Sequence, residues 1–129
     1  SGYSVALSAD GGTAIIGAPD NNGGNGTSSG HARIFTWNGA GWVQHGEDID
    51  GEAEWDDSGV SVALSSDGRT AIIGAPYNSE VGGYGAGGYS SGHARIYTRT
   101  GTGWVQLGED SDGEAYEDGS GRSVALSAE

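Results

Sequence analysis

The chain contains no cysteine, no methionine and only two prolines, and five basic residues stand against eighteen acidic ones. The absence of cysteine excludes disulfide bonds, thiolate zinc sites and cysteine nucleophiles. The formal net charge of −13 repels phosphate groups, so we expect no nucleic-acid partner. No apolar run approaches the roughly 20 residues of a transmembrane helix, so we expect no insertion into a membrane.

Large apolar residues are also few. The 129 residues include seven isoleucines, four leucines, seven valines and one phenylalanine. Such a composition in a charged chain raises the question of disorder, because only a small core can form. The length fits one domain or part of one. Since the chain starts at Ser1 and has no methionine, we expect a processed product or a piece of a longer protein.

An internal repeat answers the question of disorder. Residues 1–57 are copied in residues 58–119, and a third copy occupies residues 120–129. The first 20 residues of the two full copies agree at 16 positions, and residues 28–57 agree with 90–119 at 21 of 30. The copies differ in length only between these blocks, in a segment rich in Gly, Asn, Ser and Tyr. The copied blocks are therefore the scaffold, and the variable segment is a surface loop.

Four segments of each copy have the pattern of short strands bounded by turn residues. In the first copy they are residues 3–8, 13–18, 31–37 and 42–45. Asp10-Gly11 and Asn38-Gly39 favour tight hairpins after the first and third segments. No window shows helical periodicity, so we predict an all-β fold of four-stranded antiparallel propeller-type blades, with two full repeats plus the first strand of a third. Stacked blades need only a thin apolar layer between them.

The copied residues resemble the FG-GAP repeat. Ser-Gly-x-Ser-Val-Ala-Leu-Ser is followed in both full copies by Asp-Gly, Thr-Ala-Ile-Ile-Gly-Ala-Pro and Ser-Gly-His-Ala-Arg-Ile-aromatic. This order is similar to that in integrin alpha-subunit propellers and their microbial and algal relatives, and it covers nearly the whole chain. Gly17-Ala18-Pro19 and Gly74-Ala75-Pro76 match the Gly-Ala-Pro half of the motif, whereas Ser1, Ser58 and Ser120 stand in place of its phenylalanine.

The resemblance implies blades around an axis, with the Ser-Val-Ala-Leu-Ser strand innermost. It also implies roles in adhesion or extracellular structure more often than in catalysis. One feature of the family does not carry over. Integrin-type blades that bind calcium do so in an Asp-rich loop between the first and second strands, but here that connection is only residues 9–12 and 66–69. Too few oxygen ligands remain there for a calcium shell.

Thirteen of the eighteen acidic residues lie in two stretches, residues 47–57 and 109–118. Both stretches contain Asp-x-Asp-Gly-Glu, and calcium prefers oxygen-rich, flexible sites of this kind. The alternative is a solvated acidic connection between blades, because a run of charge usually serves solubility. The candidate calcium ligands are Asp48, Asp50, Glu52 and Asp56 in the first copy and Asp110, Asp112, Glu114 and Asp118 in the second.

Residues that recur once per copy are expected to be structural, so we predict no catalytic residue. The serines of the Ser-Val-Ala-Leu strand recur, whereas a nucleophile should be singular. His31 and His93 start the third strand of each copy, where we expect a structural hydrogen bond, because no convergent set of metal ligands accompanies them. Arg33 and Arg95 should each pair with a carboxylate of the adjoining acidic stretch.

Aromatic residues that differ between the copies could offer stacking faces to sugars. Trp37 and Trp55 differ in this way, and the candidate glycan contacts in the longer variable loop are Tyr77, Tyr84 and Tyr89. Trp42 and Trp104 recur, so we expect them to pack between blades. Asn25 begins an N-glycosylation sequon in the shorter loop, which indicates a secreted glycoprotein.

These observations predict a non-enzymatic structural or adhesive module that is extracellular or at the cell surface. Closed propellers have roughly four to eight blades, so two blades cannot form a ring. We therefore expect self-association, either of several chains joined head to tail or within a longer array or fibre. Glycan binding is the alternative function, and an enzyme ranks third.

Overall fold

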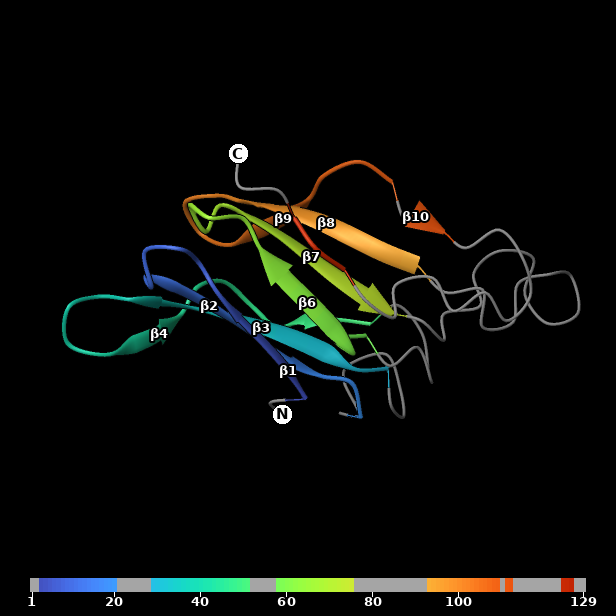
Figure 1. Ribbon diagram of the computed structural model, residues 1–129, viewed down its shortest axis with the longest axis horizontal. Helices are drawn as coiled ribbons and strands as arrows, with labels where there is room; N and C mark the ends of the chain where they lie inside the picture. The colour runs from blue at the N-terminus through green and yellow to red at the C-terminus, as the bar shows by residue number, and fades with distance from the viewer. Residues whose placement is uncertain are drawn as a thin grey trace, which may run out of the picture.

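The computed structural model describes residues 3–20, 29–51, 58–75, 93–109, 111–112 and 124–126, and for 111–112 it describes the backbone alone. Within these ranges the chain forms β-strands only, with no helix that could cross a membrane (Figure 1). The strands of the first copy are β1 (Ser4–Leu7), β2 (Thr13–Ala18), β3 (His31–Trp37), β4 (Trp42–Gln44) and β5 (Ile49–Asp50). Those of the second copy are β6 (Ser61–Leu64), β7 (Thr70–Ala75), β8 (His93–Arg99), β9 (Trp104–Gln106) and β10 (Ser111–Asp112).

The strands form two antiparallel sheets with the same topology. In the first sheet β1, β2 and β3 are neighbours in that order, and β4 and β5 both pair with the free edge of β3. The second sheet repeats this arrangement with β6, β7 and β8, and with β9 and β10 on the edge of β8. The all-β class is therefore confirmed, and the antiparallel order of the strands is as predicted.

The predicted four strands per copy become five, because the outermost strand is in two pieces. β4 pairs with Phe35–Trp37, and β5 pairs with His31 and Ala32 at the other end of β3. Gly46, with a φ of 85°, lies between the pieces and turns the chain out of the ladder. The last strand was predicted to end at residue 45, so the return of Ile49 and Asp50 to the sheet corrects that boundary.

The turn between the first two strands of each sheet is held by a serine and an aspartate. The Ser8 hydroxyl donates to Asp10 Oδ1 (2.7 Å), which also accepts the amide of Gly12, and the Ser8 oxygen accepts the amide of Thr13. Ser65 and Asp67 make the same bonds in the second sheet. The hairpin predicted at Asp10-Gly11 is thus confirmed.

The two sheets stack through unlike faces. β6 packs against β1 and β2, so that one sheet lies on the other (Figure 1). The first sheet contributes Ile15, Ala32 and Ile34 to the shared core, and the second contributes Val62, Ala71, Ile73 and Tyr97. Ile15 corresponds to Ile72 of the second copy, not to Ile73. Because neighbouring residues of a strand point to opposite faces, the second sheet uses the face opposite to that used by the first.

A seam of very close backbone contacts joins the sheets. The Ser4 hydroxyl donates to the carbonyl of Gly59 (2.8 Å), and a Cβ on Gly17 would overlap that carbonyl. Gly30 forms a parallel bridge with Ser58, whose amide donates to the carbonyl of Ser29 (3.0 Å). Glycine at position 17 is therefore required by the approach of the second copy and not by its own strand.

The propeller arrangement goes beyond what these sheets show, because no closed ring is present among the described residues. Of the third copy, the structure describes Val124–Leu126, and they belong to no strand. The first strand predicted for that copy is therefore not found in its described part.

Candidate functional site

Among the strands that the structure describes, none packs on one face of the first sheet; we call it the open face and define it by Val5, Leu7, Ile16, Arg33 and Phe35. These residues share a face because Val5 pairs with Ile16, Ile16 with Arg33, and the next pairs along the strands follow the same side. The side chains of Val5 and Leu7 are 66% and 62% exposed. An uncovered row of apolar side chains is unusual for a chain with so few of them.

The rim of this region also carries aromatic side chains. Trp37 and Trp42 lie opposite each other on β3 and β4, with ring centroids 5.6 Å apart, and both are about half exposed. Trp104, the counterpart of Trp42, is half-buried against the core and lies edge-on to His45 of the other sheet at 6.4 Å. Packing of the recurring tryptophans between sheets is thus confirmed for Trp104 but not for Trp42.

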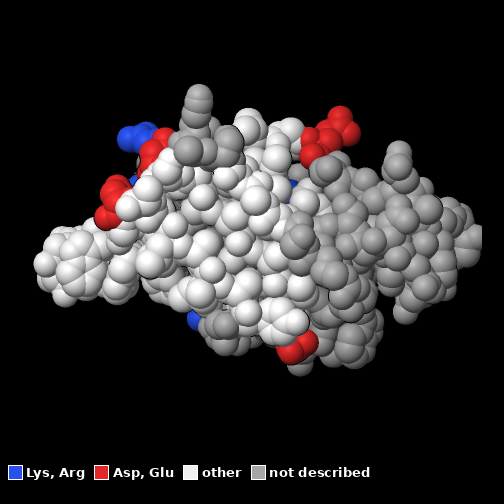
Figure 2. Space-filling view, in the orientation of Figure 1, with Lys and Arg blue, Asp and Glu red and all other residues white. Residues whose placement is uncertain are grey.

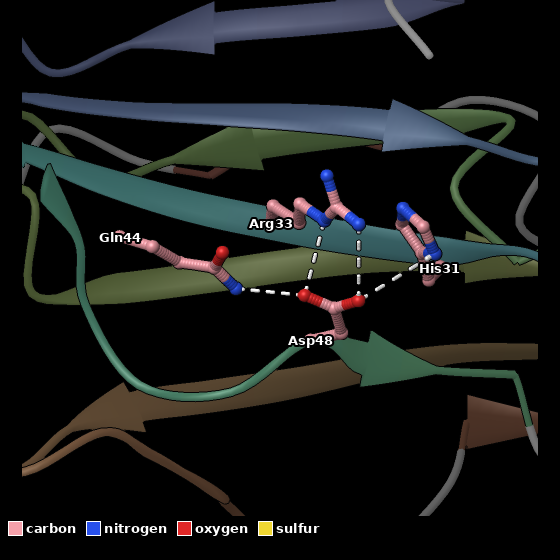
Figure 3. Close-up of polar contacts among 4 residues, drawn as sticks. All are labelled: His31, Arg33, Gln44 and Asp48. Carbon is pink, nitrogen blue, oxygen red and sulfur yellow. Dashed lines mark hydrogen bonds and ion pairs between the residues drawn. The ribbon is translucent and has the colours of Figure 1, made fainter. Parts of the chain in front are cut away.

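Figure 2 shows a face of the molecule whose middle carries no charged side chain, while acidic groups and arginines lie at the rim of the part drawn in white and colour. The first sheet carries a polar network centred on Asp48 (Figure 3). Asp48 accepts hydrogen bonds from Arg33 Nε (3.0 Å), from Arg33 Nη2 (3.4 Å) and from Gln44 Nε2 (2.7 Å). His31 Nδ1 lies 4.0 Å from the other carboxylate oxygen. The predicted pairing of Arg33 with the adjoining acidic stretch is confirmed.

Local structure explains how these side chains meet. His31 and Arg33 lie two residues apart on β3 and therefore point to the same side, and Gln44 is brought beside them by the pairing of β4 with β3. Asp48 lies between β4 and β5, where the interrupted outer strand crosses back toward β3. The network thus depends on the break in the outer strand.

The network lowers the pKa of both titratable members for different reasons. The Gln44 hydrogen bond lowers the pKa of Asp48 most, and the Arg33 guanidinium adds to this, while burial opposes it. Burial lowers the pKa of His31, and the nearby Asp48 charge only partly opposes that effect. At neutral pH the network is therefore an ionised carboxylate bound by arginine and amide, beside a neutral imidazole.

The buried imidazole makes stability depend on pH. Since the pKa of His31 is lowered from its ordinary 6.5, the unfolded chain takes up a proton before the folded one does. The free energy of unfolding should be highest above that value and fall as the pH decreases through it. We expect His31→Gln to flatten this slope between about pH 7.5 and 5.5 in urea unfolding, with the imidazole titration followed by NMR. Equal slopes in the two proteins would contradict this account.

The same cluster bears on the calcium prediction. His31, Asp48 and Asp50 each offer one atom that could bind a metal ion, and these three atoms lie within 4.8 Å of one another. However, Arg33 and Gln44 already occupy the oxygens of Asp48, and a guanidinium beside a cation would repel it. Imidazole nitrogen is also not the oxygen ligand that calcium takes. Calcium binding stays a prediction, and its other predicted ligands lie outside the described side chains: Glu52, Asp56, Asp110, Asp112, Glu114 and Asp118.

Arg95, the counterpart of Arg33, has a different environment. It is only 6% exposed, and its Nη2 donates to the backbone carbonyl of Asp50 (3.0 Å) and to the hydroxyl of Ser58 (3.4 Å). Its guanidinium also lies 5.7 Å from the centre of the Tyr97 ring. The prediction paired Arg95 with a carboxylate of the adjoining acidic stretch, but its acceptors among the described residues are the backbone carbonyl of Asp50, in the preceding acidic stretch, and the Ser58 hydroxyl. Arg95 therefore ties one sheet to the other.

Asn25 of the sequon and the candidate glycan contacts Tyr77, Tyr84 and Tyr89 lie outside the described residues. Comparison of the chain with protein-family models and with curated proteins found no match. The resemblance to FG-GAP repeats therefore stays a prediction from the sequence.

Proposed function

We propose that the chain is a non-enzymatic structural or adhesive module that acts outside the cell and assembles by stacking of its sheets into a ring, array or fibre. The observation that carries the proposal is the open face. Four of the five residues of that face have a counterpart in the second sheet that is buried, and the counterpart of Leu7, Leu64, is partly buried against the same core. The extracellular setting is supported by the resemblance to FG-GAP repeats and by the sequon at Asn25.

The difference in burial between counterparts is large. Val5 is 66% exposed, whereas Val62 is 9% exposed. Ile16 is half-buried, whereas Ile73 is fully buried. The two copies have nearly the same strand sequences, so the open face has the composition of a contact surface.

Stacking on this face is energetically reasonable. Full burial of a valine or leucine side chain contributes about 1.5–3 kcal/mol, and several such residues are needed to offset the freedom lost on association. Arg33 is no obstacle to burial, because Arg95 is accommodated at the corresponding place by a carbonyl, a hydroxyl and an aromatic ring. The net charge of −13 opposes the association of two identical chains, so the apolar and hydrogen-bonded contacts of the face have to outweigh this repulsion.

A charge placed on the open face tests the proposal. Val5→Arg would bury an unpaired guanidinium in the contact, so we expect self-association to weaken at least tenfold in sedimentation velocity. Val43→Arg is the matched control, because Val43 and its counterpart Val105 are 50% and 55% exposed, so neither sheet buries this position. If both variants sediment like the unmodified chain, the open face is not an assembly surface.

A further inference from the structure

We propose that the open face binds the outer side of the second sheet of another copy of this chain, so that copies add in one direction. This inference rests on the proposed function and specifies its partner. We call that outer side the far face and define it by Ala63, Ile72, Ala94 and Ile96. These residues share a face because Ala63 pairs with Ile72 and Ile72 with Ile96.

The contact inside the molecule is the template for the contact between molecules. The counterparts of the far-face isoleucines are Ile15 and Ile34, which are 0% and 1% exposed and cover the second sheet. Ile72 and Ile96 themselves are only half-buried, while Ala94 of the same face is 9% exposed. The molecule therefore carries both halves of its internal interface a second time, with the open face at one end and the far face at the other.

A pair of glycines supports the same arrangement. Inside the molecule Gly46 approaches Gly103 so closely that a Cβ on Gly46 would lie 2.7 Å from the Cα of Gly103. Their counterparts are Gly108 of the second sheet and Gly41 of the first, and a Cβ on either would meet nothing within 4 Å. Head-to-tail stacking places the Gly108 of one copy against the Gly41 of the next. The close approach of the neighbouring copy then explains why position 41 is glycine, since nothing within 4 Å in its own chain would obstruct a Cβ there.

Arg33 supplies a polar contact that fixes the register. Arg95 crosses the internal interface to the backbone carbonyl of Asp50 in β5. The counterpart of Asp50 is Asp112 in β10. Asp48 occupies two of the five donors of the Arg33 guanidinium, so others remain. In the stacked pair Arg33 donates to the carbonyl of Asp112 in the neighbouring copy.

Three variants, each blocked on one face, test the direction of assembly. Val5→Arg blocks the open face, and Ala63→Arg blocks the far face, with Ile96→Arg as the second far-face variant. Circular dichroism establishes that each one folds. We expect each variant alone to remain a single chain in sedimentation velocity. An equimolar mixture should form a dimer that does not grow, because one intact face of each kind is present.

Arg33→Gln introduced into the Ala63→Arg chain should weaken that mixed dimer about tenfold, since a charge-assisted hydrogen bond is lost. Arg69→Gln in the same chain removes an equal charge from an exposed turn and should leave the dimer unchanged. Three results are distinguishable. If the unmodified chain stays a monomer at all concentrations, the proposed function fails. If it assembles but the mixture stays monomeric, the head-to-tail contact is wrong. If the far-face variants assemble normally while Val5→Arg does not, the open face binds itself.

Discussion

Replacing Gly17 by valine should separate the two sheets. The Cβ of any residue at this position would overlap the carbonyl of Gly59 and lie 2.6 Å from the Ser4 hydroxyl oxygen, which donates to that carbonyl. The obstruction is backbone, so no side-chain rotation relieves it. Overpacking of this kind costs about 3 kcal/mol, a large part of the total stability of a small domain.

Thermal unfolding by circular dichroism measures this effect, and we expect the midpoint of Gly17→Val to fall by roughly 10 °C. Gly101→Ala is the control, because a Cβ at Gly101 would meet nothing within 4 Å. This substitution should therefore change the unfolding midpoint little. The variants and the unmodified chain should be compared at a protein concentration low enough to avoid self-association. A Gly17→Val chain as stable as Gly101→Ala would mean that the two copies do not pack as described.

Ile73→Ala should destabilise the chain by about 2–5 kcal/mol, because it removes a fully buried side chain from the centre of the shared core. Its counterpart Ile16 has the same strand neighbours but is only half-buried, since no strand that the structure describes packs on the open face. Ile16→Ala should therefore cost clearly less in the monomer.

Urea unfolding of both variants at low concentration tests this difference. The comparison is well matched, because the two substitutions delete the same atoms from the same repeated sequence, Thr-Ala-Ile-Ile-Gly-Ala. Equal losses of stability at the two positions would contradict the asymmetric stacking of the sheets.

Strand positions followed well from the sequence where the pattern was long. Residues 13–18 and 31–37 were predicted as strands with the bounds that the structure has, because apolar residues and closing turns mark both ends. β5 was missed, because two residues inside an acidic run carry no strand pattern of their own. Its strand structure comes from pairing with His31 and Ala32, which is a tertiary contact.

The burial of each face could not be predicted from either copy alone. Val5 and Val62 both stand in the sequence Ser-Val-Ala-Leu-Ser, yet their exposures are 66% and 9%. The difference arises from the order of the sheets in the stack and from no local feature.

The polar site was predictable only in part. The pairing of Arg33 with the acidic stretch could be predicted because basic residues are scarce: the chain has only five. The contact of Arg95 with Asp50 needed the orientation of one sheet on the other, as did the contact of His45 with Trp104. The repeat carried a signal only for the first of these contacts, because Arg95 and Asp50 both recur at the corresponding places of the other copy, whereas the counterpart of His45 is Leu107.

The central claim is that the open face binds a second copy, and the mass of the unmodified chain in solution tests it most directly. We expect the weight-average mass from light scattering and sedimentation to rise with concentration beyond that of two chains, because each bound copy presents a new open face. A folded, monodisperse monomer over the whole concentration range would contradict the claim.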